Sequence, residues 1–201
     1  MTPDSHGRPG ARIAWPATLA ARRGERLRAA HLRYRPYAAR GGVLHCFLLD
    51  CSASMLEGER LARAKGLIVA LFERAARRRE TVALVCFGGE SAEQRFGPAV
   101  PRWWNARWLA PVGGGGGTPL ARGVAAAQRV LAQAARRQPA QQRWLWVLSD
   151  GRSQETPARP TQVDQIVWVD FDDASLRLGR GERLAQAWGA LCCAPEDLVR
   201  G

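Results

Sequence analysis

Five side chains with oxygen donors follow predicted strands or a glycine run, and their types suit a hard metal ion. Asp50, Ser52 and Ser54 alternate in one turn, Thr118 ends a run of five glycines, and Asp150 follows another apolar run. A donor set made only of carboxylate and hydroxyl oxygens suits Mg²⁺ first, and then Ca²⁺ or Mn²⁺. Two carboxylates balance one divalent charge, but an octahedral ion would still need water or a partner's oxygen. The pattern therefore predicts a metal site that captures an acidic side chain of a partner.

The apolar runs that would position these side chains predict an α/β fold. Strands are expected at residues 43–49, 81–87, 144–148 and 166–171, and helices at 58–79, 119–137 and 182–191, with residues 97–112 irregular. This order predicts a Rossmann-like, doubly wound, mostly parallel sheet flanked by helices. Ligands of such sheets bind beyond the carboxyl ends of the strands. We therefore expect the three loops that carry the oxygen donors to meet at one edge.

The pattern closely resembles the von Willebrand factor A (VWA) domain and its metal-ion-dependent adhesion site (MIDAS). The family signature is D-x-S-x-S after the first strand, a later threonine, and an aspartate after the fourth strand. The matching residues, in the same order, are Asp50, Ser52, Ser54, Thr118 and Asp150. The resemblance covers about residues 43–190 and implies the VWA fold. It also implies that Ser52, Ser54 and Thr118 ligate the ion directly, and that the two aspartates act directly or through water.

A narrower resemblance, to the adhesion domain of magnesium chelatase D subunits and their cobalt chelatase relatives, lies in five short segments. These are residues 50–55, 63–66, 85–90, 115–123 and 149–152. The resemblance implies a non-catalytic component of a chelatase complex in tetrapyrrole biosynthesis, with a large chelatase subunit or an AAA+ ATPase as partner. The chain itself has no G-x-x-x-x-G-K-[ST] motif, so the glycine run is not a nucleotide cradle. A VWA scaffold for an ATPase complex unrelated to chelation is the alternative.

Four further side chains are expected to contact the partner near the metal site. They are Met55, Arg152, Trp103 and Trp104. Aromatic side chains and arginine are typical of the energetic centres of protein interfaces. For the tryptophans, a hydrophobic cap over the sheet edge is the alternative role.

The charge distribution predicts an Arg-rich N-terminal arm at residues 1–42, followed by the VWA domain at residues 43–201. The whole chain has a formal net charge of +12, and the first 40 residues hold nine arginines against two acidic residues. Such an arm is expected to dock on something acidic. Nucleic-acid binding through the arm is the alternative function. The simplest alternative is that the arm is a solvent-exposed basic segment that binds no partner.

Catalysis by Ser52 or Ser54 is not expected, because a nucleophilic serine needs a base and His6, His31 and His45 lie outside these loops. For the same reason a metal-dependent hydrolase is the weaker alternative. The N-terminus lacks the apolar core of a secretory signal, and no apolar run approaches the ~20 residues of a membrane span. With five cysteines, an odd number, these features predict a cytoplasmic protein with reduced thiols.

Overall fold

The computed structural model of the protein describes residues 12–13, 34–35, 41–102, 109, 115–173 and 179–199. The chain divides into two units, Met1–Ala39 and Arg40–Gly201. In the first unit the described residues form β1 (Arg12–Ile13) and β2 (Tyr34–Arg35), which pair antiparallel. Most of the expected arm lies outside the described residues, so its role stays a prediction.

The second unit is built on a six-stranded sheet with the strand order β5-β4-β3-β6-β7-β8. The strands are β3 (Val43–Asp50), β4 (Thr81–Gly88), β5 (Ser91–Ala99), β6 (Gln142–Ser149), β7 (Gln165–Asp170) and β8 (Leu191–Cys193). All neighbouring strands pair parallel except β4 and β5, which pair antiparallel. The predicted Rossmann-like, mostly parallel sheet is confirmed.

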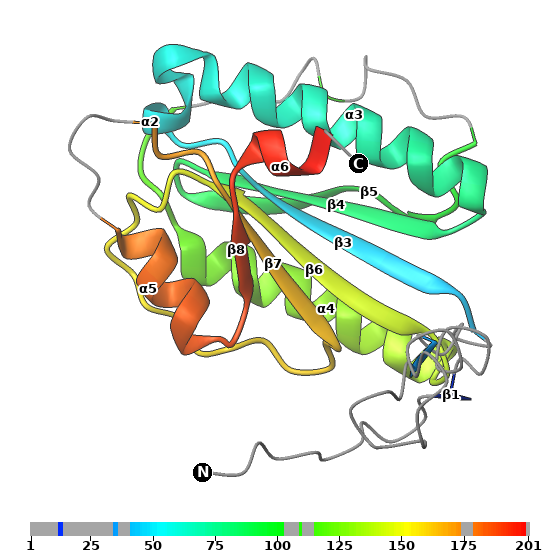
Figure 1. The fold of residues 1–201 in the computed structure, drawn as a ribbon. Helices are drawn as coiled ribbons and strands as arrows, with labels where there is room; N and C mark the ends of the chain where they lie inside the picture. Colours follow the sequence, from blue (N-terminus) through cyan, green and yellow to red (C-terminus); the bar gives the residue numbers. More distant parts are fainter. Residues whose placement is uncertain are drawn as a thin grey trace, which may run out of the picture. The chain divides into compact units, whose positions relative to one another are not determined.

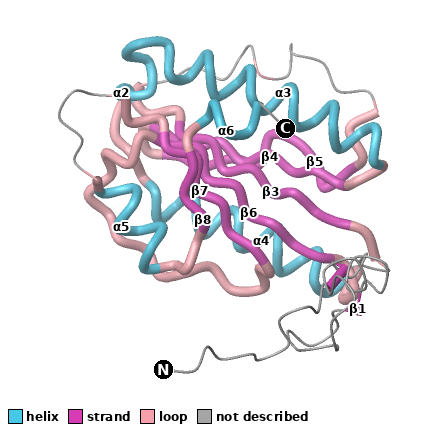
Figure 2. The backbone as a smooth tube through the Cα atoms, in the orientation of Figure 1, coloured by secondary structure: helices cyan, strands magenta, loops and turns pink. Residues whose placement is uncertain are grey.

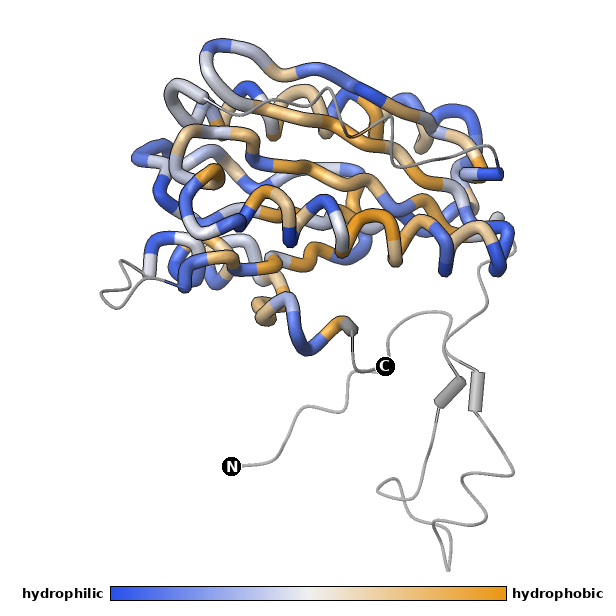
Figure 3. The backbone as a smooth tube through the Cα atoms, turned by 90° about the horizontal axis from the view of Figure 1, so that it is seen from above, coloured by the Kyte–Doolittle hydropathy of each residue, from blue (hydrophilic) through white to orange (hydrophobic). Residues whose placement is uncertain are grey.

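Helices cover both faces of this sheet (Figures 1 and 2). The helices are α2 (Ala53–Leu56), the 3-10 turn η2 (Glu57–Glu59), α3 (Arg60–Arg78), α4 (Leu120–Arg137), α5 (Arg180–Ala187) and α6 (Pro195–Val199). Helices α3 and α6 pack on one face, and α4 and α5 on the other. Figure 3 shows hydrophobic and hydrophilic residues alternating along helical turns, as expected of amphipathic helices. No helix in the described part of the chain is long and apolar enough to cross a membrane.

The core consists of two apolar layers, one on each side of the sheet. Successive residues of a strand point to opposite faces. In β3, Phe47 and Leu49 therefore pack beneath α3, whereas Cys46 and Leu48 pack against α4. Because both faces are covered, the central strands have nearly continuous apolar sequences rather than alternating ones. This is why the central strands are recognisable in the sequence.

The edges of the sheet differ from the prediction. β5 includes residues 97–99, which were expected to be irregular, and most of its residues are exposed. The predicted helix at 182–191 is also wrong at its end, because α5 stops at Ala187 and Leu191 lies in β8. Gly189 has a φ of 61°, a left-handed conformation that ends the helix and lets the chain pair with β7.

Candidate metal centre

The turn after β3 brings one carboxylate and two hydroxyls together. Asp50 is the last residue of β3 and is 0% exposed, and its Oδ1 accepts a hydrogen bond of 2.9 Å from the Ser52 backbone N–H. This bond folds the chain back toward the end of the strand. The Ser52 and Ser54 hydroxyl oxygens consequently lie 3.1 Å apart. The alternating D-x-S-x-S positions therefore share one side of the turn.

The end of β6 adds the second carboxylate. Ser149, the last residue of β6, donates its hydroxyl to Asp50 Oδ2 at 2.6 Å. Asp150 follows it and is 2% exposed, and its Oδ1 accepts a hydrogen bond of 3.2 Å from the Arg152 backbone N–H. Asp150 Oδ2 is buried and has no hydrogen-bond partner in the described part of the chain. The structure thus brings the Asp50 and Asp150 loops together and leaves one carboxylate oxygen short of donors.

The glycine segment, residues 115–117, connects the loop of Thr118 to the turn after β3 through backbone hydrogen bonds. Gly115 N–H donates to the Cys51 carbonyl at 3.0 Å, and Ala53 N–H donates to the Gly116 carbonyl at 3.2 Å. A Cβ on Gly116 would lie 2.8 Å from the Cα of Gly89, and Gly116 has a φ of 70°, so both space and conformation require glycine.

Thr118 lies next to the second carboxylate loop as well. Its carbonyl accepts a hydrogen bond of 2.9 Å from the Ser153 hydroxyl, and Ser153 lies three residues after Asp150. The threonine is half-buried. The loops 50–54, 115–118 and 149–153 therefore meet at the carboxyl ends of β3 and β6, and we call them the rim.

Burial and like charge act on the carboxylates of the rim. The pKa of Asp50 is raised to about 6, mainly by burial, with hydrogen bonds from Ser149 and Ser52 opposing the rise and the charge of Asp150 adding to it. Two acidic groups so close together favour a cation between them. The donor chemistry of the rim therefore fits a hard divalent ion.

Arg60 is a part of the rim that the sequence analysis missed. Its Nη1 donates to the Ser54 carbonyl at 3.0 Å, its Nε donates to Asp173 Oδ1 at 2.6 Å, and its Nη1 lies 3.9 Å from Asp150 Oδ2. It is 6% exposed and occupies the otherwise apolar buried face of α3. An arginine on such a face is the signal that could have identified it, since buried charges are almost always paired. Ser149 follows the strand expected at 144–148, and it was given no role because its bond to Asp50 is a contact between distant parts of the sequence.

The expected partner contacts have different environments. Met55 is 0% exposed and packs in the core beneath α3, where it offers no surface to a partner, and its partner role stays a prediction. Its side chain lies on the inward face of α2. Arg152 is half-buried, with its Nη1 3.2 Å from Glu57 Oε2 and its Nε 3.6 Å from Asp150 Oδ2, and its partner role stays a prediction. Trp103 and Trp104 lie outside the described residues.

Histidine and cysteine side chains do not contribute to the rim as described. His45 lies in β3, where its Nε2 is 3.1 Å from Glu80 Oε2 and its Nδ1 is 3.1 Å from Trp146 Nε1. His6 and His31 lie outside the described residues. No cluster of three or more His, Cys, Asp or Glu side chains suited to a metal occurs among the residues that the structure describes. A metal at the rim would therefore depend on serine and threonine hydroxyls as well as two carboxylates.

Curated relatives include subunits of magnesium chelatase. The magnesium-chelatase 67 kDa subunit of Chlorobaculum tepidum is 30% identical over 183 residues, which cover 79% of this chain and 29% of that protein. The 60 kDa subunit of Cereibacter sphaeroides is 35% identical over 108 residues, covering 54% of this chain and 19% of the subunit. An uncharacterized protein of Mycobacterium tuberculosis is 31% identical over 170 residues, covering 79% of this chain and 27% of that protein. The chain thus spans less than a third of each relative.

Two solved structures share the fold. An aerotolerance-related membrane protein from Bacteroides fragilis superposes with a TM-score of 0.56 at 17% identity, covering 79% of this chain and 98% of that one. The SpRpn10 VWA domain superposes with a TM-score of 0.53 at 14% identity, covering 78% of this chain and 93% of that one. The sequence profile of the von Willebrand factor type A domain matches residues 46–152, a range that contains every predicted ligand. The chain belongs to the von Willebrand factor type A domain family.

Proposed function

We propose that this VWA domain is a metal-ion-dependent protein interaction module. The residues that would hold Mg²⁺, or alternatively Mn²⁺ or Ca²⁺, are Asp50, Ser52, Ser54, Thr118 and Asp150. The observation that carries the proposal is the meeting of two buried carboxylates and a pair of serine hydroxyls at one rim, with Asp150 Oδ2 lacking a hydrogen-bond donor among the described residues. When bound, the ion would supply a positive charge that the two carboxylates balance. A carboxylate of the partner would complete its set of ligands.

The chain's own residues hold the donors in place. Ser149 and the Ser52 backbone N–H fix the two oxygens of Asp50, at 2.6 and 2.9 Å. Arg60 holds the turn after β3 through the Ser54 carbonyl, at 3.0 Å. Ligands held in this way are pre-organised, so less conformational freedom is lost when the ion binds.

The proposed setting is a metal-chelatase complex in the cytoplasm. Relatives named as magnesium-chelatase subunits share 30–35% identity with this chain, so we propose an accessory or D-subunit-like component that binds a large chelatase subunit or an AAA+ ATPase. The proposed location rests on the five cysteines, which form no disulfide among the described residues and would stay reduced in that compartment. The proposed module is not itself an enzyme, because His45 is held by Glu80 and Trp146 away from the serines of the rim.

Two experiments test the proposal, one measuring metal binding and the other measuring partner binding. Titration calorimetry of the full chain with MgCl₂ is expected to give one bound ion, which Asp50→Ala abolishes. Immobilised wild-type chain is expected to retain purified chelatase subunits of the same organism in Mg²⁺, but not in EDTA and not as Asp50→Ala. Asp164→Ala, which changes an exposed acid outside the rim, serves as the matched control. Retention that is unchanged in EDTA would contradict the proposed metal dependence.

A further inference from the structure

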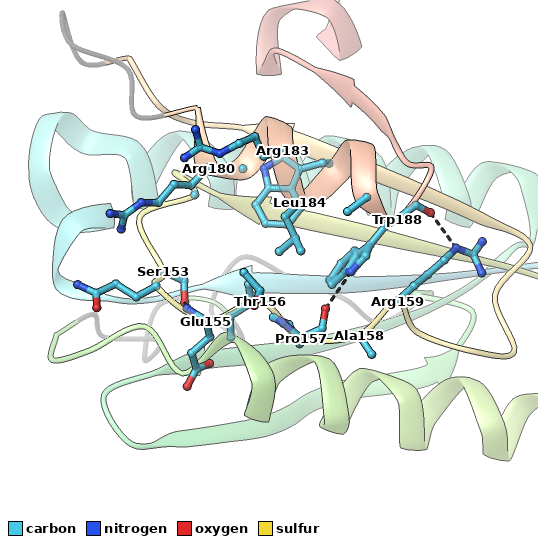
Figure 4. A pocket seen from close by; sticks show the side chains of 16 residues that line it. Ser153, Glu155, Thr156, Pro157, Ala158, Arg159, Arg180, Arg183, Leu184 and Trp188 are labelled. Carbon is cyan, nitrogen blue, oxygen red and sulfur yellow. Dashed lines mark hydrogen bonds between the residues drawn. The ribbon is translucent and has the colours of Figure 1, made fainter.

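A pocket of about 730 Å³ lies between the segment 151–159 and helix α5 (Figure 4). The chain passes from β6 to β7 there without a helix. The apolar side chains of the lining include Leu120, Pro157, Trp168, Leu184, Ala187 and Trp188. Sites for small organic ligands are commonly ~300–1,000 Å³ and mostly apolar. By size and lining, this pocket has the character of a ligand site.

The walls of the pocket are tied to each other. Trp188 Nε1 donates to the Pro157 carbonyl at 3.0 Å, and Arg159 Nε donates to the Trp188 carbonyl at 2.8 Å, as the dashed lines in Figure 4 show. The rings of Trp168 and Trp188 meet edge to face, with centroids 6.1 Å apart. The segment 151–159 is thereby fixed to the end of α5. The pocket is a pre-formed feature of this face of the sheet.

The charged lining of the pocket has a positive excess. Arg159, Arg180 and Arg183 line it together with a single acid, Glu155. The Glu155 carboxylate accepts the Ala121 backbone N–H at 2.6 Å. In the part of the chain that the structure describes, no hydrogen bond or ion pair engages the side chain of Arg180 or Arg183. Two guanidinium groups beside an apolar pocket favour an anionic ligand group.

We propose that this pocket binds a small organic anion. The apolar body of the ligand lies between the Trp168–Trp188 pair and the side chains of Leu184 and Pro157. Its carboxylate, sulfonate or phosphate is held by Arg180 and Arg183. The lining shares Gly151 and Ser153 with the rim but contains none of the five proposed metal ligands, so the proposal does not rest on the function proposed above.

The test compares two fluorescent probes of similar shape, anilinonaphthalene sulfonate and its uncharged relative phenylnaphthylamine. Wild-type protein is expected to bind one sulfonate probe per chain, and to bind it more tightly than the neutral probe. The double variant Arg180→Gln/Arg183→Gln is expected to lose at least tenfold in affinity for the sulfonate, about 1.4 kcal/mol, since both charged donors are removed. Its affinity for the neutral probe is expected to stay unchanged.

A variant that fills the pocket separates the apolar contribution to probe binding from the contribution of the arginine charges. Ala187→Trp, at an exposed helix position in the lining, is expected to weaken both probes at least tenfold. Arg129→Gln, on the exposed face of α4, and Asp50→Asn, at the rim, are expected to change neither affinity. Thermal unfolding checks that each variant is folded. If Ala187→Trp does not fold, the double arginine variant alone tests the proposal. Several probes per chain, or an unchanged affinity for the sulfonate in the double variant, would overturn the proposal.

Discussion

Polar side chains at the two ends of the central sheet differ in whether their hydrogen bonds are satisfied. Near the amino end of β3, His45 is satisfied on both sides, by Trp146 and by Glu80, at 3.1 Å each. Because an indole N–H can only donate, Nδ1 accepts it and Nε2 carries the proton toward Glu80. At the carboxyl end, Asp150 is more deeply buried than His45, whose side chain is 13% exposed, but Asp150 Oδ2 has no hydrogen-bond donor among the described residues. Buried polar atoms are normally paired. Asp150 Oδ2 has only the longer ion-pair contacts with Arg152 and Arg60, at 3.6 and 3.9 Å. A buried carboxylate oxygen without a hydrogen-bond donor therefore indicates the end of the sheet at which a ligand is expected.

Removing one negative charge from the rim gives the largest expected effect. Asp150→Asn preserves the shape of the side chain but leaves one carboxylate to balance a divalent ion. We expect the dissociation constant for Mg²⁺ to rise by more than the 10–100-fold that outer-shell partners typically contribute, at about 1.4 kcal/mol per tenfold. Titration calorimetry measures this.

The matched variant for that experiment lies at the amino end. Asp164 accepts the Arg143 backbone N–H at 2.8 Å, next to the start of β7. Asp164→Asn is expected to leave Mg²⁺ binding unchanged. Equal loss of binding in both variants would mean that net charge, rather than the rim, attracts the ion.

A methyl group in the glycine segment is expected to have a smaller effect, on stability. Gly116→Ala would place a Cβ 2.8 Å from the Cα of Gly89 at a φ of 70°. We expect a loss of about 1–3 kcal/mol, typical of strained backbone positions. Urea unfolding measures this loss of free energy.

Gly66→Ala is the matched control for the glycine segment. Gly66 lies inside α3, and a Cβ there meets nothing within 4 Å. We expect it to stabilise the domain by about 0.4–1 kcal/mol, since alanine reduces the freedom of the unfolded chain. If Gly116→Ala stabilised the domain to the same degree, the close approach of the glycine segment to Gly89 would be contradicted.

The smallest expected effect concerns pH at the amino end. Burial lowers the pKa of His45, with the charges of Arg74 and Arg78 acting in the same direction and Glu80 opposing them. Because the folded-state pKa lies below the unfolded value of about 6.5, protonation favours unfolding. The contribution of His45 to stability is therefore present above about pH 6.5 and is lost as the pH falls through the folded-state pKa.

His45→Gln tests this pH dependence. The variant is expected to lose less stability than wild type between pH 7 and pH 5, with a difference below about 1.4 kcal/mol per pH unit for a single group. Urea unfolding at the two pH values measures it. An identical pH dependence in both proteins would show that His45 is not the group responsible.

The sequence was sufficient for the central strands and for the meeting of the rim loops. Strands that are buried on both faces, such as β3 and β6, are recognisable from their own apolar residues, without knowledge of the adjacent strands. The edge strands β5 and β8 were missed because one partner strand and an exposed surface leave little apolar pattern. Arg60 and Ser149 join the rim only through tertiary contacts. The pocket beside α5 likewise depends on the path of residues 151–159, which no local pattern records.

The backbone hydrogen bonds of the glycine segment have a mechanical consequence. Gly115, Gly116 and Gly117 are joined to Cys51, Ala53 and Gly89, respectively, at 3.0–3.2 Å. A pull on Thr118 is therefore shared by main-chain amides of the neighbouring loops rather than by one hinge. The load passes directly into β3 and β4 at the middle of the sheet. A partner held at this edge would be tethered to strands that have a neighbouring strand on both sides.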